Sequence, residues 1–269
     1  MRFEHVEFEV DGQVGVITLD RPEAANAQSQ KVLMELDQAW EMADGNRDVK
    51  VIVLRSTGKH FSAGHDMAST ESNTLDWEIP LPDALYDWET RHYFHYAKRW
   101  RDVPKPSIAA VQGKCIAAGL MLCWPCDLIV AADNAEFSDP VLYMGLCGVE
   151  YHAHTWEFGA RKAKEMLFTG DILTASEAQQ SGMVNKVVPL EDLQSATMAL
   201  ANRIARQDAF SLRMAKRAVN RTLDIQGFSS ALEAAFDMHH FGHTRASVVT
   251  GGMPSIAGLD AMKGRNQGS

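Results

Sequence analysis

The sequence has few of the features that mark secreted or membrane proteins. Four cysteines in 269 residues are too few for a disulfide framework, and the chain opens with a charged and polar run rather than an apolar signal segment. The longest apolar candidate, Ile116 to Val130, is interrupted by Pro125 and Asp127 and falls short of the roughly 20 residues that span a bilayer. We therefore expect a cytoplasmic protein with no membrane partner.

The chain also has no block of lysine and arginine. Its 26 basic residues are outnumbered by 35 acidic ones, for a formal charge of -9. A broad nucleic-acid surface needs clustered cations that displace counterions from phosphates, so we expect no nucleic-acid partner. Any anionic ligand must be held by a local site.

Hydrophobic periodicity predicts an α/β fold. Short β-branched runs predict buried strands at residues 14–19, 51–54, 107–111 and 128–131. Helical spacing predicts helices at residues 29–43, 84–100, 190–206, 209–222 and 228–249. A polar stretch without clear period, 67–82, is expected to be a loop near a site. This order predicts a core domain, 1–190, followed by a helical region, 191–269.

Two segments rich in small residues, each directly after a predicted strand, are the best candidates for chemistry. Lys59–Met67 contains Ser-Ala-Gly, and Gly113–Met121 contains Ala-Ala-Gly where a helix is expected to begin. Small residues let the backbone approach a ligand, and the first N–H groups of a helix are unpaired. A tight turn or close helix–strand packing would explain either segment separately. Together they predict an oxyanion hole.

These motifs and others in the same order resemble the crotonase family, whose best-known member is enoyl-CoA hydratase. The similarity covers nearly the whole chain. The matching segments are 17–27, 61–66, 106–127, 135–137, 169–171, 175–178 and 182–184. Several ordered motifs at suitable spacing are far more specific than any one of them.

The resemblance implies a spiral of ββα turns with a C-terminal helical region that builds homotrimers, often paired into hexamers. It also implies an acyl-CoA thioester substrate whose carbonyl oxygen lies between the backbone amides of His65 and Ala118. The positions that it places against the coenzyme A moiety are Ala24, Ala25, Ala63, Asp66, Met67 and Ala68. It implies no cofactor beyond that moiety and no metal ion.

The sequence departs from the family's hydratases at two catalytic positions. Those enzymes use two glutamates to activate water, and the corresponding residues here are Met121 and Val141, which cannot transfer a proton. Glu150 is our first candidate for a replacement, followed by His152 or His154. A solvated glutamate or a packed histidine would explain each of them equally well.

Three functions remain open at this point. The first is a hydratase/isomerase-type enzyme that stabilises a thioester enolate and uses an unusual acid–base residue. The second is an acyl-CoA-binding homologue with little or no catalysis. The third is a family isomerase, hydrolase or dehalogenase that uses Glu150 or a nearby histidine.

The sequence contains one motif of the redox or zinc type, Cys123-Trp124-Pro125-Cys126. A zinc site needs a second ligand pair at credible spacing, which Cys115 and Cys147 do not form. A redox thiol needs exposure and a depressed pKa. Because the motif lies in an apolar stretch, we interpret these cysteines as packed, reduced thiols.

The remaining histidines carry weaker signals. His92 and His95 share a helix face that lines the acyl pocket in relatives, although a polar helix face facing a loop or a subunit is the favoured interpretation. His239, His240 and His243 lie on the last predicted helix. We interpret them as part of a subunit interface or of a neighbouring subunit's adenine site.

Overall fold

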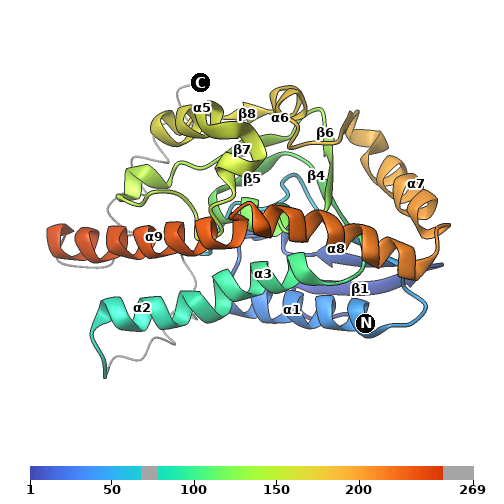
Figure 1. Cartoon of the computed structure of the whole chain (residues 1–269), viewed down its shortest axis with the longest axis horizontal. Helices are drawn as coiled ribbons and strands as arrows, with labels where there is room; N and C mark the ends of the chain where they lie inside the picture. The colour runs from blue at the N-terminus through green and yellow to red at the C-terminus, as the bar shows by residue number, and fades with distance from the viewer. Residues whose placement is uncertain (68–77, 251–269) are drawn as a thin grey trace.

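A six-stranded sheet forms the centre of the protein in a computed structural model, which describes residues 1–67 and 78–250 (Figure 1). The strand order is β1-β2-β3-β4-β6-β9, with β1 antiparallel to β2 and all other neighbours parallel. The strands are β1 (Val6–Asp11), β2 (Val14–Leu19), β3 (Val51–Ser56), β4 (Ser107–Val111), β6 (Leu128–Ala132) and β9 (Lys186–Val188). Every residue of β2 and β4 is buried, as expected for strands covered on both faces.

A second, smaller sheet lies beside the first. Its strands, in the order β5-β7-β8, are β5 (Lys114–Ile116), β7 (Glu136–Ser138) and β8 (Leu173–Thr174). The chain passes repeatedly from the large sheet to the small one and then into a helix, as in β4–β5–α4 and β6–β7–α5. These are successive ββα turns of a spiral.

Nine α-helices are described, and short 3-10 turns join several of them to the strands. The helices are α1 (Gln30–Gly45), α2 (Leu81–Glu89), α3 (His95–Asp102), α4 (Leu120–Cys123), α5 (His154–Thr169), α6 (Ala175–Ser181), α7 (Leu193–Ala205), α8 (Ala209–Ile225) and α9 (Phe228–Thr250). Local capping explains several helix starts: Ser29 Oγ accepts a hydrogen bond from the amide of Val32, and Thr174 and Glu177 form a capping box. Within the described residues, no helix is both long and apolar enough to cross a bilayer.

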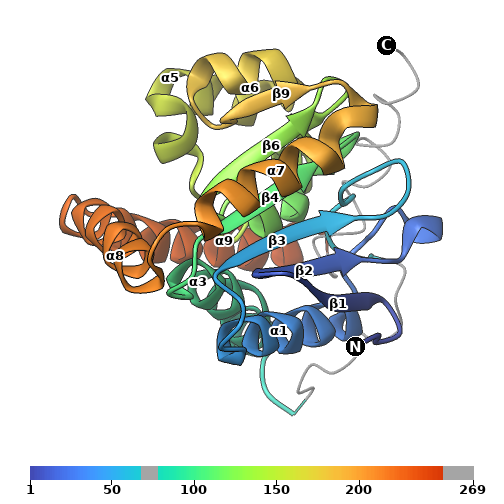
Figure 2. The same cartoon turned by 90° about the vertical axis from the view of Figure 1, so that its right-hand side faces the viewer.

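Helices cover both faces of the large sheet. On one face α7 packs across β3, β4 and β6 through Leu193, Ala201 and Ala205 (Figure 2). On the other face α1 buries the apolar positions that helical spacing predicts, including Leu36 and Trp40. Figure 1 shows α8 and α9 running alongside α2 and α3. Helix α9 is tied to them by ion pairing between Lys98 and Glu233 and by other contacts.

The predicted elements are confirmed with three differences. The helix predicted over 84–100 consists of α2 and α3 joined by a π-helical turn at Thr90–Phe94. The helix expected after the strand at 107–111 is preceded by β5 and is only a 3-10 turn, Ala117–Gly119, followed by the four-residue α4. The stretch 67–82 is partly helical, because α2 begins at Leu81; residues 68–77, and with them Ala68, lie outside the described residues.

The C-terminal helices differ in how they pack. Helix α7 belongs to the core, whereas none of the 17 residues of α8 is buried. Large apolar side chains on α8, including Phe210, Val219 and Ile225, are exposed. The division of the chain at residue 190 stays a prediction.

Candidate active site

The two small-residue segments lie directly against each other. The amide of Ser62 donates to Lys114 O and Ser62 O accepts from the amide of Ile116, both at 3.1 Å. A Cβ atom on Gly64 would lie 2.9 Å from Ile116 O, and one on Gly119 would lie 2.6 Å from Ser62 O. Both positions therefore require glycine, because a side chain would collide with backbone. Gly64 also has a φ of +91°, which favours glycine.

This close approach places Gly64, the neighbour of His65, against Ala118. A Cβ atom on Gly64, the residue before His65, would lie 3.3 Å from Ala118 N. Ala118 is in the first turn of the 3-10 helix, where N–H groups have no partner within the helix. Gly64 O and Asp66 N are both bonded to Gln28, so the His65 N–H between them points to the opposite side.

Neither amide is used by the described protein. No backbone or side-chain acceptor in residues 1–67 and 78–250 takes a hydrogen bond from the His65 or Ala118 N–H. Ala117, just before Ala118, has a φ of +49°, a left-handed conformation that is rare for a residue other than glycine. The turn is thus held in a costly shape that leaves an amide free.

The residues expected to contact coenzyme A are also brought together. The amide of Ala63 donates to Ala25 O at 3.0 Å. Arg21 Nη1 lies 2.6 Å from Asp66 Oδ2. This ion pair connects the 3-10 turn Pro22–Ala24 to the segment Lys59–Met67. Ala63 and Met67 are exposed at this surface.

Met121 and Val141, where the resemblance leads us to expect the two hydratase glutamates, are both buried. Met121 lies in α4, and Val141 begins a 3-10 turn after Pro140. Both pack in the main hydrophobic core. Neither side chain can transfer a proton.

Glu150 is buried and paired with the side chain of His65. Its Oε1 lies 3.2 Å from His65 Nε2 and 3.5 Å from His239 Nε2. Burial alone would raise the pKa of Glu150, but the charges of His65 and His239 outweigh it and hold that pKa well below the ordinary value. The Tyr93 ring stacks on His65, with centroids 3.8 Å apart. The surface glutamate interpretation is wrong, since Glu150 is only 4% exposed.

The other two candidate bases have different environments. His154 is fully buried, and its Nε2 lies 2.9 Å from Asp139 Oδ2, which also accepts from the amide of Val149. His152 packs against Gly148 and the ring of His154. Burial and the neighbouring His154 lower the pKa of His152 to about 4, so it is neutral at physiological pH.

A second buried carboxylate, Glu89, lies near Glu150. Glu89 ends α2 at the start of the π-helical turn, and α9 brings His239, His240 and His243 to it. The Nε2 atoms of these three rings lie 3.6, 3.2 and 3.5 Å from the Glu89 carboxylate oxygens, in that order. We call the following set the imidazole–carboxylate cluster: His65, Glu89, Glu150, His239, His240 and His243.

Opposite charges stabilise the ionised groups of this cluster. Burial would lower the pKa of His239, but Glu150 and Glu89 raise it to about 9. Burial would raise the pKa of Glu89, but His243 and His239 lower it. His240 is less compensated, and burial lowers its pKa to about 4.

The interpretation of the α9 histidines as part of a subunit interface or of a neighbouring subunit's adenine site is wrong. His239, His240 and His243 are buried within the chain itself, so they do not form a surface for a neighbouring subunit. The spacing of His239 and His243, four residues apart on one helix, was the available signal. Nothing in the sequence marked Glu89.

The two histidines of the helix at 84–100 have no part in this cluster. His92 donates a hydrogen bond from Nδ1 to Trp88 O, and His95 is exposed.

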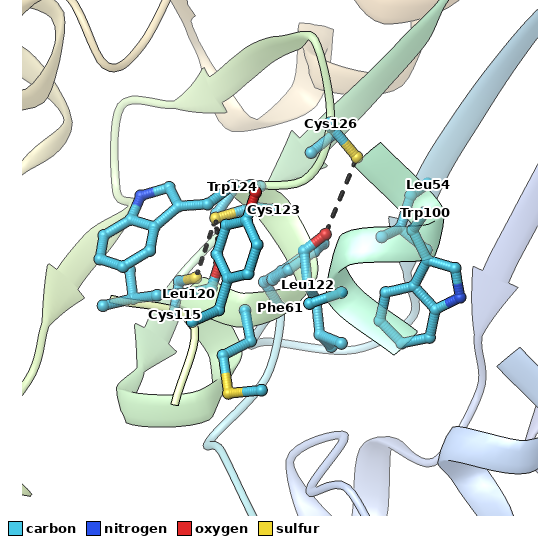
Figure 3. Close-up of a cluster of buried hydrophobic side chains, with 14 of the residues drawn as sticks. Leu54, Phe61, Trp100, Cys115, Leu120, Leu122, Cys123, Trp124 and Cys126 are labelled. Atoms are coloured by element: carbon cyan, nitrogen blue, oxygen red, sulfur yellow. Dashed lines mark hydrogen bonds between the residues drawn. The ribbon is translucent and has the colours of Figure 1, made fainter. Parts of the chain in front are cut away.

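The cysteines of the Cys-Trp-Pro-Cys motif lie in an apolar environment (Figure 3). With Cys115 they form what we call the thiol cluster: Cys115, Cys123 and Cys126. Cys115 Sγ and Cys123 Sγ are 3.7 Å apart, and Cys126 Sγ donates to Leu122 O. Burial raises the pKa of Cys126 to about 12 and that of Cys123 well above its usual value. Buried, protonated thiols suit neither redox exchange nor zinc binding.

Comparison with known proteins gives consistent matches over nearly the whole chain. A family model described as enoyl-CoA hydratase/isomerase matches residues 9–254. The Mycobacterium tuberculosis protein named "Putative enoyl-CoA hydratase EchA13" is 42% identical over 277 residues, covering 96% of this chain and 86% of that protein.

Solved structures show the same arrangement of sheets and helices. The crystal structure of a probable enoyl-CoA hydratase from Mycobacterium smegmatis has a TM-score of 0.88 at 54% identity and covers 94% of this chain and 99% of that one. A structure from Mycobacterium thermoresistibile, also described as a probable enoyl-CoA hydratase, has a TM-score of 0.86 at 56% identity. It covers 91% of this chain and 99% of that one.

Proposed function

Because the chain belongs to the enoyl-CoA hydratase/isomerase family, we propose that it binds an acyl-CoA thioester and stabilises its enolate between the amides of His65 and Ala118. The main support is that Gly64, the residue before His65, lies against Ala118 and that neither N–H group has an acceptor within the described protein. Loss of the α-proton places negative charge on the thioester oxygen. A preorganised donor to such an oxygen contributes about 2.7 to 4 kcal/mol to transition-state stabilisation.

The coenzyme A moiety is assigned to the surface beside these amides. Ala24, Ala25, Ala63, Asp66 and Met67 lie on two segments that are hydrogen-bonded to each other, which supports a single binding surface. The proposed reaction uses no cofactor beyond this part of the substrate.

Glu150 is the proposed acid–base residue. It is hydrogen-bonded to the side chain of His65, whose amide is one of the proposed oxyanion donors. The carboxylate is therefore next to the reacting end of the substrate, and Met121 and Val141 leave the usual proton-transfer positions empty of acids and bases.

Homotrimers, alone or paired into hexamers, are the proposed assembly. Helix α8 buries none of its residues within the chain, and its exposed Phe210, Val219 and Ile225 would lose apolar surface to water if α8 packed on a neighbouring copy.

A second candidate function is acyl-CoA binding without turnover, which the two apolar replacements Met121 and Val141 favour. Enolate formation distinguishes the candidates, whatever reaction follows it. The test incubates acyl-, enoyl-, 3-hydroxyacyl- and haloaryl-CoA with the protein in D2O. NMR follows exchange of the α-protons where the substrate has them, and product formation is followed for all four.

The enzyme function predicts turnover of at least one substrate, or exchange, and a loss of about 10²- to 10⁴-fold in Glu150→Gln. Glu233→Gln, a substitution of an exposed carboxylate on α9, should behave as the wild type. Saturable thioester binding with neither exchange nor turnover would support the binding function. Equal binding of a thioester and of its thioether analogue, which lacks the carbonyl oxygen, would contradict the oxyanion hole.

A further inference from the structure

We propose that Glu89, His239 and His243 form a binding site for one divalent transition-metal ion of the Zn²⁺ type. One ligand atom from each residue lies within 4.8 Å of the other two, and all three residues are buried. Two imidazole nitrogens and one carboxylate oxygen are a ligand set that zinc uses in proteins, with a fourth position left for another ligand. The resemblance to the crotonase family implies no metal ion, and this site is independent of the acyl-CoA function.

Two helices aim the three ligands at one point. His239 and His243 are four residues apart in α9, so their rings project from the same helix face. Glu89 is the last residue of α2, where the backbone changes to the π-helical turn. Such turns within a helix often occur at functional sites.

The spacing of the two imidazoles is close to that around a shared ion. His239 Nε2 and His243 Nε2 lie 2.8 Å apart. Ligands about 2.0 to 2.1 Å from a zinc ion are roughly 3 Å or more from each other, so an ion needs only a small separation of these rings. Metal binding displaces protons from nitrogen, which would remove any proton held between them.

His239 is oriented as a metal ligand. Its Nδ1–H donates to Gly148 O at 2.7 Å, because a carbonyl oxygen can only accept. The opposite nitrogen, Nε2, then faces Glu89 and His243. Histidines that bind metal ions usually donate their second N–H to a carbonyl or carboxylate in this way, which fixes the ring and its tautomer.

The charges and unpaired atoms around the site also favour a cation. Glu89 and Glu150 are both buried, and among the described residues their ion pairs are with histidines, not with lysine or arginine. Glu89 Oε2 and His240 Nε2 lie 3.2 Å apart but form no hydrogen bond, and Glu150 Oε2 has no hydrogen-bond partner either. Buried polar atoms without hydrogen bonds are costly, and a divalent ion would neutralise the Glu89 carboxylate directly.

The fourth position is left for a water molecule or another small ligand. Glu150 lies beside the three ligands, with its Oε1 3.5 Å from His239 Nε2, and is not one of them.

The test uses the full-length protein after removal of metals with a chelator. Calorimetric titration with Zn²⁺ should give one ion per chain. Loss of a residue that only hydrogen-bonds to a metal ligand raises the Kd about 10- to 100-fold. Glu89→Gln and His243→Asn remove ligands, so each should raise the Kd for Zn²⁺ by more than this. The matched controls Glu233→Gln and His95→Asn, which change exposed side chains, should bind as the wild type.

Two further measurements separate loss of binding from loss of folding and identify the ligands. Zn²⁺ should raise the Tm of the wild type and of both controls but not of the two ligand variants, whose folding is checked by circular dichroism. Bound Co²⁺ should show the visible bands of a nitrogen and oxygen site without thiolate charge transfer.

The proposal is overturned if the wild type binds no Zn²⁺, if Glu89→Gln and His243→Asn keep wild-type affinity, or if the Co²⁺ spectrum shows thiolate ligands. Absence of binding in the folded wild type would mean that the cluster is held by shared protons alone.

Discussion

Two buried clusters of this protein are both made of residue types that bind metals elsewhere, yet their environments are opposite. The thiol cluster comes mainly from one short segment and packs against apolar side chains such as Phe61, Leu120 and Trp124 (Figure 3). The imidazole–carboxylate cluster draws on residues from four separate parts of the chain, and two of its members are buried carboxylates. Only the first cluster has a recognisable sequence motif.

The difference shows that the effect of burial on the pKa of a group depends on the charges of its neighbours. In the thiol cluster burial keeps the groups neutral, as the raised pKa of Cys126 indicates. In the other cluster burial is outweighed by opposite charges, so Glu150 and His239 are both ionised. Proximity in the fold, rather than spacing in the sequence, decides which cluster can hold charge or bind a cation.

The largest effect on stability is expected from His239→Leu. This substitution removes the imidazole between two buried carboxylates, and loss of one partner from a buried ion pair costs about 3 to 5 kcal/mol. The free energy of unfolding in urea measures it. The control His95→Leu, at an exposed position, should change stability by less than about 0.5 kcal/mol. A wild-type midpoint for His239→Leu would mean that the carboxylates do not depend on this ring.

A smaller, pH-dependent effect is expected from His152, whose pKa burial lowers, whereas the neighbouring carboxylates raise the pKa of His239. The pKa of His152 in the folded protein is about 4, below the ordinary value of 6.5, so the unfolded chain takes up the proton first. The contribution of neutral His152 to the free energy of unfolding is therefore complete above pH 6.5. It is lost as the pH falls towards 4, by at most about 1.4 kcal/mol per pH unit.

Urea unfolding of the wild type and of His152→Gln at pH 7, 5.5 and 4.5 tests this expectation. The variant should lose less stability on acidification than the wild type does. Parallel losses in the two proteins would show that His152 is protonated as easily in the folded state as in the unfolded chain.

Cys123→Ala should cost less, about 1 kcal/mol, the typical cost of a single substitution. The side chain that it removes is small and uncharged, and no buried charge is left without a partner. The substitution should also leave Zn²⁺ binding unchanged. A loss of Zn²⁺ stoichiometry in this variant would transfer the metal site to the thiol cluster.

The smallest effect is expected from thiol reagents on the folded protein. Because burial raises the pKa of Cys123 and Cys126, very little thiolate is present at pH 8. Their labelling should be no faster than unfolding, while all four cysteines should react in denaturant. Rapid labelling of either residue in the native protein would revive the redox interpretation.

Local patterns predicted much of the fold. The strands β2, β3, β4 and β6 and the helix α1 follow directly from apolar periodicity, and the relatives confirm the crotonase fold. The π-helical turn at Thr90–Phe94 was not predictable, because it has no pattern that differs from an α-helix. The exposed apolar face of α8 likewise reads as an ordinary amphipathic helix until its surroundings are known.

The candidate site divides in the same way. The small-residue segments around Gly64 and Gly119 were visible in the sequence, because close backbone approach excludes larger side chains wherever it occurs. The pairing of Glu150 with His65 was not visible, since 85 residues separate them.

The sequence by itself thus determined most of the strands and helices and the two small-residue segments, because these depend on residue identity and on neighbours along the chain. Only the tertiary structure decided that Glu89 meets His239 and His243 and that Glu150 pairs with His65. The physical reason is that charge compensation in a low-dielectric interior depends on distance in space. These distances are set only after helix α2, helix α9 and the loop before α5 have packed together.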